Sequence, residues 1–124
     1  MIDLPITLTG RVVHGKALAR QFDMPTANIE PREDITGLEF GVYFSKVMVD
    51  GCEYRAITNL GVRPTVQDGS RINAESFIYD FNGDLYDKEI SVILTKFKRP
   101  ETKFSSVDDL FAAIRKDIED GRLS

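Results

Sequence analysis

Cysteine and histidine are almost absent from the sequence. Its 124 residues contain one cysteine, Cys52, and one histidine, His14. A single thiol excludes a disulfide framework within the chain, and one thiol with one imidazole excludes the cysteine and histidine cages that bind zinc. Any metal ion here must therefore be held by oxygen ligands, and that donor set favours Mg²⁺.

Long apolar runs and basic clusters are also lacking. No run approaches the length of a membrane span, and the first residues show no cationic stretch followed by an apolar one, as a secretory signal would. Lys and Arg number 16 against 20 Asp and Glu, which gives a net charge of −4. This balance argues against nucleic-acid and membrane binding. We therefore expect a cytoplasmic protein with neither kind of partner.

The composition that remains is typical of one folded domain. Hydrophobic residues make up 42% and charged residues 29%, which is far from the balance of disordered chains. No repeat, low-complexity tract or linker interrupts the sequence. We predict a single domain over residues 1–124.

Short runs of β-branched and aromatic residues fill most of the first two-thirds of the chain. They predict strands at residues 6–13, 41–49, 53–58, 74–81 and 88–97. Asp50-Gly51 lies between two of these runs and predicts a hairpin, while Asp68-Gly69 and Asn82-Gly83 mark further turns. The pattern is typical of a mainly β protein.

The C-terminal part has helical periodicity instead. One apolar stripe is formed by Val107, Leu110, Phe111, Ile114 and Ile118. This spacing predicts an amphipathic helix of about four turns. Ser106 and Asp109 form a capping box at its start, and Gly121 is expected to end it. Strands followed by one such helix indicate a small antiparallel barrel or sandwich, with the helix packed over an opening or an edge.

The predicted strand at 74–81 carries a candidate catalytic residue. Alternation along a strand puts Glu75 on the same face as Phe77, Tyr79 and Phe81. If that face is buried, partial desolvation raises the pKa of the Glu75 carboxyl and makes it a stronger base toward a substrate hydroxyl. The alternative is that Glu75 lies at a frayed strand end and reaches water.

A second cluster offers neutral oxygen ligands. Thr26 and Asn28 stand two positions apart after Pro25, and Gly15 and Arg20 precede them. A hydroxyl and an amide oxygen suit Mg²⁺ when a phosphate supplies the negative charge. The alternative is a turn in which these residues serve only backbone hydrogen bonds.

A third region joins the last predicted strand to the helix. Residues 98–104 mix cations with one aromatic residue, Phe104. Such a loop is suited to lie over a flat ligand, and the alternative is a solvated connector. Composition does not separate the two.

Taken in order, these segments resemble the riboflavin kinase (flavokinase) family, including the kinase domain that forms the C-terminal half of bacterial bifunctional FAD synthetases. The resemblance covers almost the whole chain. Its motifs are Thr9-Gly10-Arg11-Val12-Val13-His14-Gly15, Pro25-Thr26-Ala27-Asn28-Ile29, Gly41-Val42-Tyr43, Asn59-Leu60-Gly61-Val62-Arg63-Pro64-Thr65, Glu75, Asp80-Phe81, Asp84-Leu85-Tyr86, Arg99 with Glu101, Lys103-Phe104 and the final helix.

The resemblance implies a fold and a reaction. The fold is a six-stranded antiparallel Greek-key barrel with a C-terminal helix. The reaction transfers the γ-phosphate of ATP to the ribityl 5′-hydroxyl of riboflavin, with Mg²⁺, to make FMN. The implied roles are catalytic base for Glu75, Mg²⁺ binding for Thr26 and Asn28, nucleotide contact for Gly15, Arg20 and Tyr86, and flavin contact for Arg99, Thr102 and Phe104.

The chain departs from the family pattern at the phosphate loop. Ala17, Leu18, Ala19 and Asp23 stand where the family usually has Gly, Arg, Gly and Gly. These replacements motivate a second hypothesis, a flavin-binding module that has weak or lost kinase activity. The resemblance also leaves two alternatives for the partner activity. An FMN adenylyltransferase domain is either fused to this one, which would then be part of a longer bifunctional chain, or separate.

Overall fold

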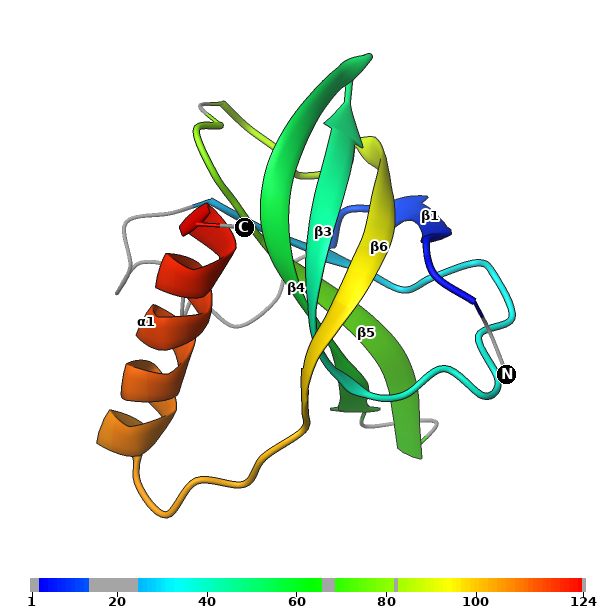
Figure 1. Ribbon diagram of the computed structural model, residues 1–124. Coiled ribbons are helices and arrows are strands. Elements are labelled where there is room, and N and C mark those ends of the chain that lie inside the picture. The colour runs from blue at the N-terminus through cyan, green and yellow to red at the C-terminus, as the bar shows by residue number, and fades with distance from the viewer. Residues whose placement is uncertain (1–2, 14–24, 66–68, 82, 124) are drawn as a thin grey trace.

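The described residues fold as one curled antiparallel sheet with one helix beside it (Figure 1). The computed structural model describes residues 3–13, 25–65, 69–81 and 83–123, and the side chains of all of these except 63–71. The elements are β1 (Ile6–Arg11), β2 (Thr26–Ile29), β3 (Gly41–Val49), β4 (Cys52–Thr65), β5 (Gly69–Ile78), β6 (Glu89–Pro100) and α1 (Val107–Leu123). None of the helices in these residues is long and apolar enough to cross a membrane.

The strand order confirms the predicted fold class. The strands run β1-β6-β3-β4-β5-β2, and each neighbouring pair is antiparallel. β3, β4 and β5 form a meander and β6 returns to lie beside β3, which is a Greek key. The two edge strands also approach each other, because the Val13 N–H donates to the Asn28 carbonyl (2.8 Å) and the Arg32 N–H donates to the Thr9 carbonyl (3.1 Å). The sheet is therefore a curled half-barrel.

Two separate cores follow from strand alternation. Side chains such as Leu8, Ile29, Leu60 and Leu94 fill the inside of the curl and are fully buried. The opposite, outer face of the sheet carries Val42, Ile57, Phe77 and Tyr79, which pack with Ile118 of α1. Burial of apolar side chains on the outer face holds the helix against the sheet. The candidate site lies at this second, outer core.

Several predicted element bounds need correction. β4 continues past residue 58 to Thr65, through Gly61 and Pro64, which composition alone would assign to a loop. β5 ends at Ile78, and Asp80 has a positive φ of 57°, so alternation stops before Phe81. Phe81 therefore packs at the inner core, with its ring edge-on to Tyr54, and not on the face of Glu75. The hairpin at Asp50-Gly51 is confirmed, with both residues at positive φ.

The helix start agrees with the sequence, but its end does not. The Asp109 N–H is capped by the Ser106 hydroxyl (3.1 Å). α1 runs through Gly121 to Leu123, so Gly121 does not end the helix as expected. A Cβ at Gly121 would overlap the Tyr79 hydroxyl and the Ile57 side chain. This glycine is thus a packing residue that lets the helix approach the sheet closely.

Tyr79 stabilises the contact between the helix and the sheet with a hydrogen bond. Its hydroxyl donates to the Ile118 carbonyl of α1. Burial raises the pKa of Tyr79 to about 12, against the opposing effect of the nearby Arg122 and Arg55 guanidinium groups. The phenol therefore keeps its proton, and the hydrogen bond, across the neutral pH range.

We expect Gly121→Ala to destabilise the protein, opposite to the usual effect of this change in a helix. Helix propensity alone would favour Ala by about 1 kcal/mol, but overpacking against Tyr79 and Ile57 costs about 1–3 kcal/mol. A net loss of up to about 2 kcal/mol in the free energy of unfolding should appear in urea denaturation. Glu119→Ala, at an exposed position of the same helix, is the control and should be close to neutral. A more stable Gly121→Ala variant would contradict the packing account.

Candidate active site

A cavity of about 510 Å³ opens between the outer face of the sheet, the loop after β6 and the helix. Its apolar wall is formed by Val42, Ile57, Phe77, Phe104, Leu110, Ile114 and Ile118. Its polar groups are those of Asn59, Glu75, Arg99, Glu101, Thr102, Lys103 and Asp117. An apolar pocket of this size with a few convergent polar groups is typical of a small-molecule site.

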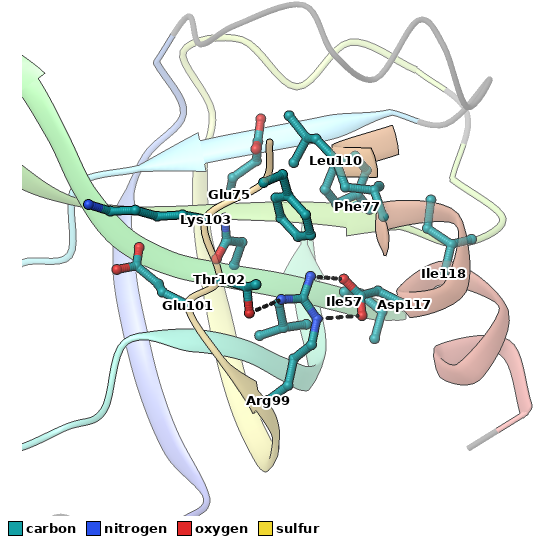
Figure 2. Close-up of a pocket in the computed structure, with 14 residues that line it drawn as sticks. Ile57, Glu75, Phe77, Arg99, Glu101, Thr102, Lys103, Leu110, Asp117 and Ile118 are labelled. Carbon is teal, nitrogen blue, oxygen red and sulfur yellow. Dashed lines mark hydrogen bonds and ion pairs between the residues drawn. The ribbon is translucent and has the colours of Figure 1, made fainter. Parts of the chain in front are cut away.

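The cavity gathers four residues that the sequence proposed from separate segments. Glu75 comes from β5, Arg99 from β6, and Thr102 and Phe104 from the loop before α1. In Figure 2, Glu75 lies at one end of the cavity and Arg99 at the other, beside α1. The loop therefore lines the pocket and is not merely a solvated connector. The roles of these four residues stay predictions.

Glu75 is held in the middle of the sheet and not at a frayed end. It pairs with Asn59 of β4 on one side and with Asn28 of β2 on the other. Residues directly opposite each other in antiparallel strands point to the same face. Asn59, Glu75 and Asn28 therefore form a polar row on the outer face, with Glu75 half-buried between the two amides.

Thr26 and Asn28 lie on a strand, so the turn alternative for them is wrong. Thr26 is opposite Phe77 and Asn28 is opposite Glu75 across the β2–β5 pair. The Asn28 side chain is 5% exposed and its Oδ1 accepts a hydrogen bond from Asn73 Nδ2 (3.1 Å). The register thus sets a hydroxyl and an amide oxygen next to the carboxylate, just beyond the cavity wall.

These oxygens fit a divalent cation whose charge is balanced by a ligand. The described residues contain no group of three or more His, Cys, Asp or Glu side chains that would hold a metal alone. Thr26 and Asn28 contribute neutral oxygens, and the Oδ1 atom of Asn73 is buried without a hydrogen-bond partner in the described part of the chain. Mg²⁺ prefers oxygen ligands and is often bound together with substrate phosphates, so neutral oxygens suit it where a phosphate supplies the negative charge.

Arg99 is oriented by a carboxylate on the helix. Its Nε and Nη2 atoms donate to Oδ1 and Oδ2 of Asp117, at 3.0 and 2.7 Å, and Figure 2 shows this pair at the cavity wall. The same guanidinium lies 3.4 Å from the Thr102 hydroxyl and 5.9 Å from the Phe104 ring centroid. A planar fork held at two points leaves little freedom to turn away from the cavity.

A β-bulge explains how two adjacent residues reach one carboxylate. Lys98 Nζ also donates to Asp117 Oδ1 (3.0 Å), although neighbouring residues of a regular strand point to opposite faces. Val42 pairs with Arg99 and Tyr43 pairs with Phe97, so Lys98 is the extra residue of the bulge. The bulge turns both cations toward α1.

The cation pair sits in a partly buried environment. Asp117 is 4% exposed, and Lys98 makes a further ion pair with Asp120 (3.1 Å). Partial burial opposes the charge on Lys98, but hydrogen bonds with Asp117 and Asp120 outweigh it, so the pKa of Lys98 is raised. Lys98 therefore stays charged near neutral pH, and its ion pairs tie β6 to α1.

Gly41 allows this end of β6 to approach β3. Its φ is 152°, and a Cβ there would collide with the Arg99 carbonyl oxygen and lie close to Pro100. Any side chain would push away the strand end that carries Arg99. The glycine is thus part of the framework of the site.

The predicted nucleotide contacts lie elsewhere. Tyr86 is 52% exposed and does not line the cavity. It stands on the turn before β6, where the Asp87 N–H donates to the Val12 carbonyl (3.2 Å), and the next residue, Val13, is bonded to Asn28. The turn that carries Tyr86 and the strand that carries Asn28 are therefore both hydrogen-bonded to the backbone of Val12 and Val13. Gly15 and Arg20, with Ala17, Leu18, Ala19 and Asp23, lie outside the described residues.

Sequence reasoning missed Asp117 as a site residue. A signal was present, because Asp117 falls on the apolar stripe of the helix, beside Ile118 and three residues after Ile114. A carboxylate on a buried helix face requires a partner, and such pairs often belong to functional sites. Its partner Arg99 was identified, but the bulge that joins them has no sequence signature.

Comparison with known proteins identifies the same family. The family model described as Flavokinase, riboflavin kinase, matches residues 2–124. A bifunctional riboflavin kinase/FMN adenylyltransferase of Pseudomonas fluorescens is 38% identical over 122 residues, which cover 98% of this chain and 39% of that protein. The chain thus spans about two fifths of the length of the curated relatives it matches.

Two solved structures are similar in fold. A crystal structure described as a macrolide-efflux protein from Streptococcus pneumoniae has a TM-score of 0.80 and 35% identity, and covers 95% of this chain and 38% of that one. A riboflavin kinase from Trypanosoma brucei has a TM-score of 0.59 and 23% identity, covering 94% and 76%, and supports the fold alone. With a family model that matches from residue 2 to residue 124, the chain belongs to the riboflavin kinase family.

Proposed function

We propose that the chain is a riboflavin kinase, which transfers the γ-phosphate of ATP to the ribityl 5′-hydroxyl of riboflavin and releases FMN and ADP. The observation that carries the proposal is the place of Glu75. Its carboxylate stands between an apolar cavity on one side and the neutral oxygens of β2 on the other. A kinase that phosphorylates a hydroxyl on a molecule with a flat ring needs a pocket for the ring, a base next to the hydroxyl and, beyond the base, a place for the metal ion and the phosphates.

The cavity suits the flavin ring. Its volume of about 510 Å³ lies within the usual range for small-ligand pockets. Phe77, Ile57 and Leu110 give it an apolar wall that would cover a planar aromatic ring. Arg99, Thr102 and Phe104 would contact the flavin, with the guanidinium held in place by Asp117.

Glu75 would act as the general base. Its carboxylate would take the proton of the 5′-hydroxyl while the hydroxyl oxygen bonds to the γ-phosphorus and the bond to the β-phosphate oxygen of ADP breaks. Thr26 and Asn28 would hold Mg²⁺ against the phosphates, and the bound ion would neutralise charge on the transferred group. Gly15, Arg20 and Tyr86 would contact the nucleotide.

The second hypothesis is a flavin-binding module with weak or lost phosphoryl transfer, motivated by the changed residues between Gly15 and Pro25. The two hypotheses separate in one assay with riboflavin, ATP and MgCl₂, followed by chromatography. FMN formation supports the kinase. Bound riboflavin without FMN and without ATP·Mg²⁺ affinity would favour the module. We place the activity in the cytoplasm, with an FMN adenylyltransferase, fused or separate, as the next enzyme to use FMN.

We expect Glu75→Gln to lower the rate of FMN formation by about 10²–10⁴-fold, because the amide keeps the shape of the side chain but does not accept the proton. Riboflavin affinity, measured by fluorescence quenching, should change by no more than about twofold. Glu53→Gln, on the exposed hairpin end far from the cavity, is the matched control. Full activity in Glu75→Gln would refute the role of base.

We expect Asp117→Asn to weaken riboflavin binding by about tenfold or more, since one neutral amide does not hold Arg99 at two points. The effect should fall on Kd and KM for riboflavin, with kcat and KM for ATP much less affected. Asp120→Asn removes a negative charge that pairs with Lys98 on the same helix but leaves Arg99 paired, so its riboflavin Kd should match the wild type. Equal losses in both variants would show a general effect on the helix.

A further inference from the structure

Asn59 lines the cavity, but the proposed roles give it no task. It lies on β4 and is exposed, so a ligand in the cavity can reach it. A side-chain amide carries both donors and acceptors, and a few polar groups of this kind fix the orientation of a ligand in an otherwise apolar pocket. The position of Asn59 along the cavity decides which part of a ligand it meets.

Strand pairing sets five residues of the site in one row. Val42 of β3 is opposite Arg99 on one side and Asn59 on the other. Glu75 of β5 is opposite Asn59 on one side and Asn28 of β2 on the other. Side chains of directly opposite residues leave the same face, so the row crosses the outer face of the sheet from Arg99 to Asn28. Figure 2 agrees, since Arg99 and Glu75 lie at opposite ends of the cavity.

The row gives Asn59 a defined place relative to the candidate base. Neighbouring strands are about 4.8 Å apart, so Asn59 lies one strand from Glu75, whereas Arg99 lies three strands from it. The apolar Val42 lies between Asn59 and Arg99. A ligand whose ring is held at the Arg99 end and whose reacting hydroxyl is at Glu75 must therefore pass Asn59 just before it reaches the base.

In riboflavin, the part next to the reacting hydroxyl is polar. The ribityl chain joins the ring to the terminal 5′-hydroxyl and carries secondary hydroxyls along its length. A hydroxyl both donates and accepts hydrogen bonds, as a primary amide does, so the two groups are complementary. A ribityl hydroxyl placed against an apolar wall without a partner would lose its hydration without a replacement.

We propose that Asn59 hydrogen-bonds a secondary hydroxyl of the ribityl chain and so determines specificity for a flavin that carries this chain. The inference rests on the proposed function and extends it from the ring and the base to the chain between them. The amide would hold the terminal hydroxyl at Glu75 through its neighbour on the chain. The contribution of Asn59 to flavin binding then disappears when the ligand has no ribityl chain.

The test compares riboflavin with lumiflavin, which has the same ring with a methyl group in place of the ribityl chain. Each flavin is titrated with protein in the absence of ATP, and fluorescence quenching gives its Kd. Asn59→Ala should raise the Kd for riboflavin by about five- to tenfold, through loss of one hydrogen bond, and leave the Kd for lumiflavin within about twofold of the wild type. Glu53→Ala, at the exposed hairpin end of the same strand, is the control and should change neither value.

Other roles for Asn59 predict other results. If the amide only supports the sheet or the wall around the ring, Asn59→Ala should weaken the binding of both flavins equally. If it only orients the carboxylate of Glu75, both Kd values should stay at the wild-type level while kcat for FMN formation falls. Either result would overturn the inference.

Failure of the kinase proposal is seen separately, because the Kd values are measured without ATP. A wild-type protein that binds riboflavin but forms no FMN would contradict the kinase activity. A selective loss of riboflavin affinity in Asn59→Ala would still support the role of Asn59 in that case.

Discussion

The ion cluster around Asp117 is the interaction on which the rest of the site depends. One carboxylate, 4% exposed, accepts hydrogen bonds from both Arg99 and Lys98. Without these cations the charge of Asp117 would be very unfavourable in the contact between helix and sheet, and without Asp117 the cations would repel each other. The cluster closes one end of the cavity because it joins the last strand to the helix that follows it.

The outer face of the sheet carries the candidate site, while its inner face carries most of the buried apolar side chains. Among the described residues, the interior of the curl is filled by apolar side chains from all six strands. On the outside, the helix covers only part of the surface, and the cavity is formed where the helix and the loop after β6 leave the strands uncovered. Glu75 points to this outer face because side chains alternate along β5, and its neighbours Ala74 and Ser76 are buried on the inner side.

Local patterns predicted much of this arrangement. Asp50-Gly51 predicted its hairpin because both residues accept positive φ, and period-two alternation placed Glu75 beside Phe77. Features that depend on contacts between distant segments were not predictable. β2 has only four residues and is a strand because β5 pairs with it, and Gly121 stays helical because Tyr79 and Ile57 occupy the space of a side chain. The bulge at Lys98 likewise exists only in the pairing with β3.

The polar row of Asn59, Glu75 and Asn28 gives a physical reason for the small number of charged metal ligands around the site. A site with several carboxylates would repel a triphosphate, whereas one carboxylate flanked by amides does not add such a barrier. In the proposed mechanism, Glu75 is the single base between the two substrates, with Asn28 and Asn59 on either side as neutral neighbours. In that mechanism, negative charge would enter the site mainly with the nucleotide, so the neutral residues around Glu75 would couple metal binding to nucleotide binding.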